Sequence, residues 1–184
     1  MLTIYKDPRT IFRLVDIAML TGESDFMSLN KKLNYYVQTG NLLNLRKGIY
    51  AKTDYNTEEL GCLIYKPAYI SLEYVLQQSG IVFQYDPGVT VVSYLSRNIE
   101  VAGQAFRFRK IKGEILVNTE GIIRKENHVN IASPERAFLD LLYLNSKYYF
   151  DHLNPVSIPA VKKLLPLYGS KTLSERALKL LKND

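Results

Sequence analysis

The stretch from Asp25 to Tyr50, DFMSLNKKLNYYVQTGNLLNLRKGIY, carries a helix pattern, a glycine stop and a basic hairpin in immediate succession. Ser24 or Asp25 can cap the start of the helix by accepting a free backbone N–H, and Gly40 suits the left-handed residue that ends it. Two short apolar strands then flank the turn Arg46-Lys47-Gly48, which places two cations at the hairpin tip. This order is typical of the second half of a winged helix-turn-helix, a motif that binds DNA.

The helix in this stretch is expected to have one apolar and one polar face. Apolar residues recur at spacings of three and four, which puts them on a single buried stripe. The stripe consists of Phe26, Leu29, Leu33, Tyr36 and Val37. The opposite face and the hairpin tip supply the candidate DNA contacts. These are Ser28, Asn30, Lys31, Lys32, Asn34, Tyr35, Arg46 and Lys47.

The candidate contacts divide by their chemistry. Asparagine amides can form paired hydrogen bonds with adenine, so Asn30 and Asn34 are candidate base contacts, and Lys31 can reach guanine. The remaining cations are expected to hold backbone phosphates. From Phe26 to Thr53 the chain has basic residues but no Asp or Glu, so positive charge is concentrated where a phosphate-binding face requires it.

The preceding segment predicts the first helix of the motif. Leu14, Ile17, Ala18 and Leu20 form a short apolar stripe, and Thr21-Gly22-Glu23 gives a sharp turn before the next helix. A purely structural interpretation also exists, because any amphipathic helix followed by a hairpin can serve as scaffold and a run of charges is usually a solvated face. The pattern alone leaves both interpretations open.

Five segments spread along the chain carry a family resemblance. They are FRLVDIA (residues 12–18), GNL (40–42), RKGIYA (46–51), PAYISLEYVL (67–76) and IASPERAFLD (131–140). In order and spacing they resemble the AbiEi family, antitoxin and transcriptional-regulator proteins of abortive-infection, or phage-defence, toxin–antitoxin systems. The resemblance implies an N-terminal winged helix that binds operator DNA and autoregulates its operon. It also implies a C-terminal domain that counteracts a nucleotidyltransferase-like toxin.

DNA and a toxin are the two partners that these observations lead us to expect. Operators read by such modules are commonly inverted repeats, so a monomer or a homodimer on double-stranded DNA is expected. The alternative function is a protein-interaction module, an antitoxin or adaptor that binds its toxin directly and makes no sequence-specific DNA contact. Direct binding of a toxin and neutralisation without a stable complex are both compatible with the sequence.

The chain is expected to be an α+β protein of two domains, residues 1–65 and 66–184, because Pro67 stops a connecting helix at 60–65. The second is expected to be a mixed α/β domain with a mainly antiparallel sheet and C-terminal helices. Strands are expected at 89–95, 98–101, 105–111, 115–117, 121–124 and 128–131. Helices are expected at 71–79, from Pro134 after the cap Ser133, at 158–165 and at 173–181.

Two groups in the second domain are candidate contact sites. Alternation along residues 106–111 puts Phe106, Phe108 and Lys110 on one face and Arg107, Arg109 and Ile111 on the other. The first candidate group is a basic surface for nucleic acid or toxin, formed by Arg107, Arg109, Lys110 and Lys112. The second is a polar cluster formed by Ser71, Glu73, Glu135 and Asp140. The structural alternatives are a solvated strand face, a helix start at Ser71 and a dipole contact at Glu135.

We expect no enzymatic activity, cofactor or metal site. No Asp or Glu is followed two residues later by Lys, as a restriction-type nuclease motif requires, and His128 and His152 have no ligand at zinc spacing. Glycine-rich phosphate loops and the Gly-x-Ser-x-Gly motif are absent from the sequence. These absences favour a binding protein over a catalyst.

Composition agrees with a globular protein of the cytoplasm. The 184 residues are 47% hydrophobic, and their net charge of +6 favours polyanionic partners. The single cysteine, Cys62, cannot form an internal disulfide and has apolar neighbours, which indicates a buried thiol in a reducing compartment. No apolar run approaches the length of a membrane span, and the N-terminus lacks a signal-peptide pattern, so no membrane contact is expected.

Overall fold

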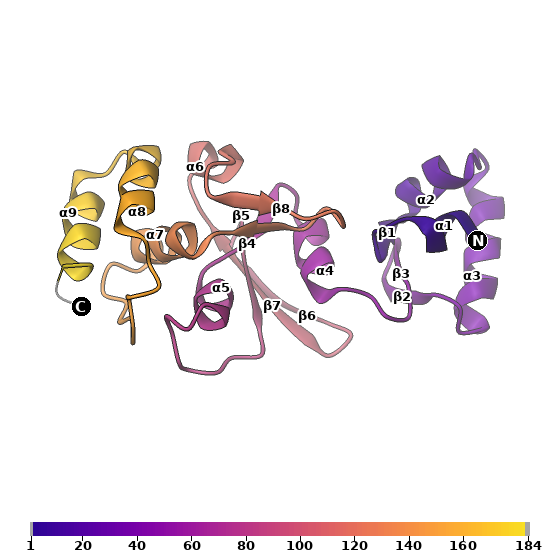
Figure 1. Ribbon diagram of the computed structural model, residues 1–184. Helices are drawn as coiled ribbons and strands as arrows, with labels where there is room; N and C mark the ends of the chain where they lie inside the picture. The colour runs from indigo at the N-terminus through magenta and orange to yellow at the C-terminus, as the bar shows by residue number, and fades with distance from the viewer. Residues whose placement is uncertain (1, 183–184) are drawn as a thin grey trace.

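The computed structural model describes residues 2–182. It is an α+β molecule with a three-stranded antiparallel sheet near the N-terminus, a six-stranded mixed sheet and C-terminal helices. The shape is elongated: the N-terminal helices and their small sheet lie at one end, and the C-terminal helices lie at the other (Figure 1). None of the helices within residues 2–182 combines the length and the hydropathy that a membrane-spanning helix requires.

The N-terminal unit contains three helices and three short strands. They are α1 (Leu2–Lys6), β1 (Ile11–Arg13), α2 (Leu14–Thr21), α3 (Phe26–Gln38), β2 (Leu43–Arg46) and β3 (Ile49–Ala51). The strand order is β1-β3-β2, so the strand that precedes α2 pairs with the returning strand of the hairpin. The sequence predicted α2, α3 and the hairpin, whereas α1 and β1 were not foreseen.

Both faces of the three-stranded sheet carry buried residues. Phe12 and Tyr50 are paired in register, and both belong to a small core with the N-terminal helices. Ile11 and Ala51, the neighbouring pair in register, belong instead to the large core that fills the rest of the molecule. Because successive residues of a strand point to opposite faces, this sheet separates the two cores and contacts both.

The remainder of the chain surrounds the six-stranded sheet. Its strands are β4 (Ala68–Ile70), β5 (Val89–Ser93), β6 (Arg97–Val101), β7 (Gln104–Lys110), β8 (Ile122–Arg124) and β9 (Asn130–Ala132), in the order β6-β7-β5-β4-β9-β8. The helical elements are α4 (Thr57–Ile64), α5 (Glu73–Gln78), α6 (Gly113–Val117), α7 (Pro134–Leu144), α8 (Ile158–Leu164), the 3-10 helix η1 (Leu165–Tyr168) and α9 (Lys171–Leu180). The sheet is mixed because β5 pairs parallel with β7, and β4 pairs parallel with β9.

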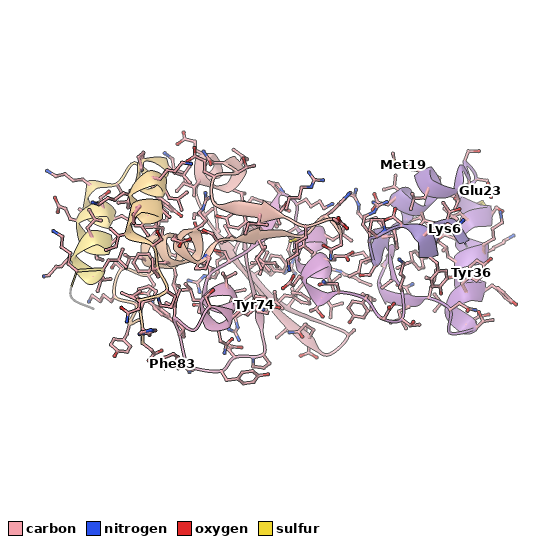
Figure 2. The ribbon with its side chains drawn as sticks, in the orientation of Figure 1. Lys6, Met19, Glu23, Tyr36, Tyr74 and Phe83 are labelled. Carbon is pink, nitrogen blue, oxygen red and sulfur yellow. The ribbon has the colours of Figure 1, made fainter. Side chains whose placement is uncertain are left out.

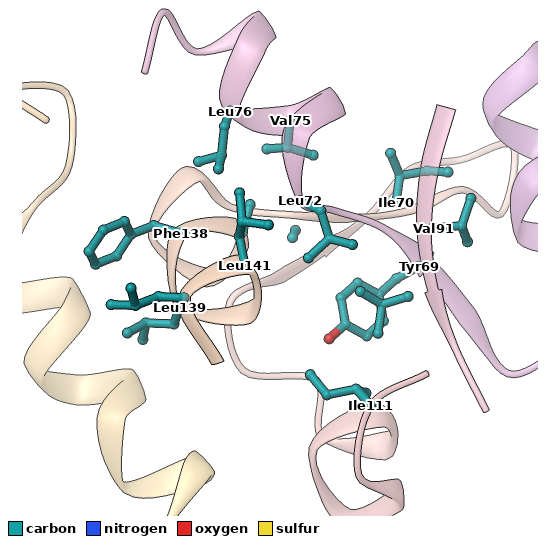
Figure 3. Packing of buried hydrophobic residues seen from close by; sticks show 14 of the residues in the cluster. Tyr69, Ile70, Leu72, Val75, Leu76, Val91, Ile111, Phe138, Leu139 and Leu141 are labelled. Atoms are coloured by element: carbon teal, nitrogen blue, oxygen red, sulfur yellow. The ribbon is translucent and has the colours of Figure 1, made fainter. Parts of the chain in front are cut away.

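Helix α7 is the central element of the large core. Ser133 caps it and Pro134 occupies its first turn, as the sequence predicted. Phe138, Leu139 and Leu141 are buried in the same cluster as apolar side chains of α5 and β4 (Figure 3). Burying each such side chain contributes about 1.5–3 kcal/mol. The buried residues of α7 therefore stabilise the packing of the large core.

Two expectations about local structure are wrong. Residues Ile115–Val117, expected as a strand, form the end of the short helix α6. The carbonyl oxygen of Ile115 accepts a hydrogen bond from the buried Arg136 side chain at 2.7 Å, so a tertiary contact outweighs the β-propensity of this segment. Phe26, expected inside the apolar stripe of α3, is 47% exposed because it is the first helical residue and lies at the end of that stripe.

Glu59 of α4 connects the N-terminal unit to the rest of the molecule. Its side chain is buried, and its carboxylate accepts hydrogen bonds from the backbone N–H groups of Thr10 at 2.8 Å and Ile11 at 3.1 Å. The same carboxylate accepts from the Asn127 amide at 2.9 Å, between β8 and β9. One carboxylate therefore joins the segment before β1 to the far part of the six-stranded sheet.

Candidate nucleic-acid interface

A tight turn joins α2 to α3. Gly22 has a φ of 69°, a left-handed conformation that favours glycine, and the N–H of Glu23 donates to the Ala18 carbonyl at 3.2 Å. Of the two candidate caps, Asp25 accepts the hydrogen bond from the Met27 N–H, at 2.8 Å. The turn and the cap together determine the direction in which α3 leaves α2.

The outward face of α3 carries four exposed sequence-predicted contacts. Lys31, Asn34 and Tyr35 are exposed, as is Lys32, whereas Ser28 is half-buried. Met27, which the sequence pattern did not indicate as a contact, is 73% exposed and lies one helical turn before Lys31. This face therefore combines a cation, an amide, a phenol and an apolar thioether.

The two candidate asparagines have different surroundings. The amide of Asn30 donates to the Phe26 carbonyl at 2.9 Å, and its oxygen accepts a weak hydrogen bond from the Tyr50 hydroxyl at 3.4 Å. Within residues 2–182 no hydrogen bond engages the side chain of Asn34. Asn34 is consequently the asparagine whose amide is available to a partner.

Lys32 is compensated inside the protein. Its ammonium group forms an ion pair with Glu23 in the turn before α3, with an N–O distance of 2.6 Å. The hydrogen bond between them raises the pKa of Lys32 and lowers the pKa of Glu23, because each charge stabilises the other. Figure 2 shows Glu23 and Met19 on the N-terminal end of the molecule, where Met19 is 78% exposed.

The hairpin tip is exposed and basic. Gly48 adopts a φ of 74° in the turn, and its carbonyl accepts a hydrogen bond from the N–H of Leu14 at 3.0 Å. This bond holds the tip against the start of α2. Arg46 and Lys47 are exposed beside it, and no acidic side chain of residues 2–182 forms an ion pair with either.

Lys52 differs from the other cations of this stretch. It is buried, and its ammonium group donates to the carbonyl of Asp7 at 2.7 Å. Lys52 therefore stabilises the loop between α1 and β1, and its charge is not presented at the surface. Residues 26–53 contain basic residues and no acidic ones. Because Lys52 is buried, however, not all of these cations face outward.

The cations on and after the basic strand β7 differ in their contacts. Phe106 and Phe108 are buried as alternation predicts, and Arg107 forms a bidentate ion pair with Asp86. Lys112 pairs with Glu114 at 2.7 Å, so two of the four cations proposed for a contact surface have acidic partners. Arg109 and Lys110 are exposed, while Ile111, beyond the end of β7, is buried.

The candidate polar cluster is only partly assembled. Ser71 donates to the Asp140 carboxylate at 2.8 Å, which brings these two residues together in the large core. Glu73 lies at the start of α5, and Glu135 accepts a hydrogen bond from the N–H of Ser157 at 3.3 Å, so neither belongs to that contact. The cluster consists instead of Asp140, Ser71 and three residues that the sequence pattern did not indicate.

Arg136, Tyr69 and Tyr168 complete this buried network. Arg136 has no exposed surface and forms an ion pair with Asp140 at 3.3 Å. The hydroxyls of Tyr168 and Tyr69 donate to the same carboxylate at 2.7 and 3.0 Å. Burial raises the pKa of Asp140, and the charge of Arg136 with the three hydroxyl donors opposes that shift. The sequence signal was an Arg and an Asp four residues apart in a largely apolar helix.

The buried network is satisfied by the chain itself. Arg136 also donates to the carbonyls of Glu120 at 2.8 Å and Ile115 at 2.7 Å, so its guanidinium orders the segments around α6. Buried charges are tolerated when they are paired and hydrogen-bonded, as these are. The network therefore has a structural role.

Comparison with known proteins adds no relationship to these observations. The chain matches no protein-family model, and no curated protein sequence matches it significantly. Within residues 2–182 no three His, Cys, Asp or Glu side chains gather in a way that could hold a metal ion.

Proposed function

We propose that residues 2–52 form a winged helix-turn-helix that binds double-stranded DNA. The order helix, strand, helix, helix and hairpin supports this assignment, with α3 as the recognition helix and β2–β3 as the wing. The observation that carries the proposal is that three exposed cations have no ion-pair partner among the described residues. Lys31, Arg46 and Lys47 have no ion-pair partner in residues 2–182, so their charge is available to phosphates.

The contacts refine the roles within this interface. Asn34 and Lys31 are the base-reading residues, since the amide of Asn30 is held by Phe26 and Tyr50. Met27 offers an apolar surface to a thymine methyl group on the same face of α3. Arg46 and Lys47 hold phosphates through the wing. Tyr35 and Ser28 contribute positioning contacts, and Lys32 contributes less because Glu23 compensates its charge.

At the level of the whole chain, we propose a transcriptional repressor that acts as an AbiEi-like antitoxin and autoregulates its operon. Support for this part is the sequence resemblance at residues 12–18, 40–42, 46–51, 67–76 and 131–140. The N-terminal unit would place the protein on an inverted-repeat operator as a monomer or homodimer. The second unit would counteract a nucleotidyltransferase-like toxin in the cytoplasm.

Fluorescence anisotropy with a duplex from the region upstream of the gene tests the DNA proposal. Arg46→Ala with Lys47→Ala is expected to weaken binding to all sequences and to reduce the log–log salt slope by about 1 for each phosphate that the wing no longer neutralises. Lys162→Ala with Lys163→Ala removes the same charge from α8 and is the matched control, since both lysines are exposed. The control is expected to change neither quantity appreciably.

Substitution in α3 tests the base-reading role separately. Asn34→Ala is expected to alter preference at one base pair at a cost of about 1–3 kcal/mol, while Asn30→Ala leaves sequence preference unchanged. The DNA proposal is wrong if the chain shows no salt-sensitive binding to any duplex. It is also wrong if the α8 control weakens binding as much as the wing variant.

A second candidate function is a protein-interaction module that binds a toxin directly. The observation in its favour is a set of exposed aromatic side chains on the second unit: Phe83 is 67%, Tyr85 82% and Tyr149 78% exposed. Figure 2 shows Phe83 on the surface away from the N-terminal unit. Co-purification with the product of the neighbouring gene, abolished in a Phe83→Ser, Tyr85→Ser variant that still binds DNA, would support it.

A further inference from the structure

A cleft of about 600 Å³ opens on the second unit, outside the proposed DNA interface. One side is formed by the end of α4 and the start of β4, with Lys66, Pro67 and Tyr69. The other side is formed by α6, the loop after it and β8, with Val117, Asn118 and Arg124. Its volume lies in the range of pockets that take small molecules of drug or nucleotide size.

The cleft has a positive lining without acidic residues. Lys66, Arg124 and His128 line it, and no Asp or Glu does. In the described chain, residues 2–182, neither Lys66 nor Arg124 takes part in an ion pair. Partial burial, and then the charge of nearby Arg13, lowers the pKa of Lys66. The charge of Asp16, which lies outside the cleft, opposes this shift. Cations without an ion-pair partner around a concave surface favour an anionic ligand.

The other lining groups supply apolar surface and hydrogen-bonding amides. Pro67, Val117 and Ile122 provide apolar surface, while Asn118 and Asn130 provide amides that both donate and accept hydrogen bonds. Pockets of this kind typically combine a mainly apolar wall with a few polar groups that fix the orientation of the ligand.

The buried network keeps the wall of the cleft in place. Arg136 donates to the carbonyl of Ile115 in α6 and to that of Glu120 before β8, on either side of the loop that lines the cleft. It also donates to the hydroxyl of Tyr69, a lining residue, at 3.1 Å. The cleft is therefore formed by segments that one buried guanidinium holds together, so little reorganisation is needed before binding.

We propose that this cleft binds a phosphate monoester with a flat, partly apolar body, a class represented by nucleoside 5′-monophosphates. Lys66, Arg124 and His128 hold the phosphate, Pro67 and Val117 cover the faces of the ring, and the amides read its edge. The proposal does not depend on DNA binding, because ligand binding is measured without DNA.

Calorimetric titration of the full chain with the four common nucleoside monophosphates tests the proposal. At least one is expected to bind with a Kd below about 1 mM, and its nucleoside and inorganic phosphate to bind at least about tenfold more weakly. Arg124→Gln is expected to weaken that binding about tenfold or more, because it removes a charge-assisted contact. Arg97→Gln, an identical change at an exposed position of β6 outside the cleft, is the matched control.

Lys66→Gln provides a second variant, and circular dichroism checks that each variant is folded. The proposal is overturned if no monophosphate binds at about 5 mM, since such a contact set should exceed that affinity. It is also overturned if the nucleoside binds as tightly as its monophosphate, or if Arg97→Gln weakens binding as much as Arg124→Gln. If a 5′-phosphorylated tetranucleotide bound more tightly than the mononucleotide, the proposal of a free nucleotide as ligand would be rejected. The ligand would then be the 5′ end of a nucleic-acid strand.

Discussion

Replacing Asp140 with Asn is expected to destabilise the protein severely although it changes only one non-hydrogen atom of the side chain. The two carboxylate oxygens of Asp140 divide four donors between them. Oδ1 accepts from Tyr168 at 2.7 Å and from Arg136 at 3.3 Å, and Oδ2 accepts from Ser71 at 2.8 Å and from Tyr69 at 3.0 Å. An asparagine retains one accepting oxygen, so its NH₂ group meets two donors that lose their acceptor.

The magnitude follows from these contacts. Each buried donor left without an acceptor costs about 1–3 kcal/mol. The guanidinium of Arg136, fully buried, loses its counter-charge, and breaking a buried pair in this way costs about 3–5 kcal/mol. These terms overlap, because hydroxyls can rotate toward other acceptors, so the expected loss in free energy of unfolding is about 4 kcal/mol. That is a large part of the 5–15 kcal/mol, roughly, that stabilises a typical protein.

Urea unfolding followed by circular dichroism measures this loss as a decrease in the urea concentration at the unfolding midpoint. The slope of the unfolding free energy against urea concentration is expected to stay constant. Glu135→Gln, the same chemical change in the same helix, is the control and is expected to cost less than about 0.5 kcal/mol, because Gln can still accept from the Ser157 N–H. Arg136→Met combined with Asp140→Asn is expected to cost less than the sum of the single changes, since the orphaned charge is removed. An Asp140→Asn variant within about 1 kcal/mol of the parent would refute the interpretation of this network.

Three further outcomes follow from other contacts. Glu59→Ala, which removes the acceptor for Thr10 and Ile11, is expected to make the chain between α1 and β1 more sensitive to limited proteolysis, whereas an unchanged cleavage pattern would contradict its connecting role. Burial raises the pKa of Cys62 to about 11, so the native thiol is expected to react slowly with iodoacetamide at pH 8 and rapidly in urea; rapid native reaction would disprove its burial. The hydrogen bond from Arg107 lowers the pKa of Asp86, so this pair stabilises above the ordinary aspartate range of about 4 and its contribution disappears below it. Asp86→Asn should therefore cost stability at pH 6 but little at pH 2, and an equal cost at both would exclude this linkage.

The elements with strong local signals were predictable from the sequence. Helix α3 has a capping Asp25 and an apolar stripe of period 3.6, and α7 has Ser133 and Pro134 at its start, so local rules suffice. The segment at Ile115 shows where such rules fail. Its β-branched composition favours a strand, but the donor that takes its carbonyl comes from Arg136, 21 residues later in the chain.

The candidate interface was predictable as a region but not residue by residue. The exposed positions of Lys31 and Asn34 follow from helical periodicity alone. The pairing of Lys32 with Glu23, the inward hydrogen bonds of Asn30 and the burial of Lys52 depend on neighbours brought close by folding. Periodicity assigns a residue to a face of a helix, but it does not reveal which side chains of that face the protein itself already occupies.

The three-stranded sheet, with Phe12 and Tyr50 in one core and Ile11 and Ala51 in the other, limits how this protein can be taken apart. A fragment that ends after β3 would expose the face that carries Ile11 and Ala51, and would be prone to non-specific association. Transplanting the N-terminal unit onto another protein therefore requires a replacement for the surface that α4 and its neighbours supply. In this chain β1 and β3 contribute buried residues to the large core, so moving the N-terminal unit alone would uncover apolar surface.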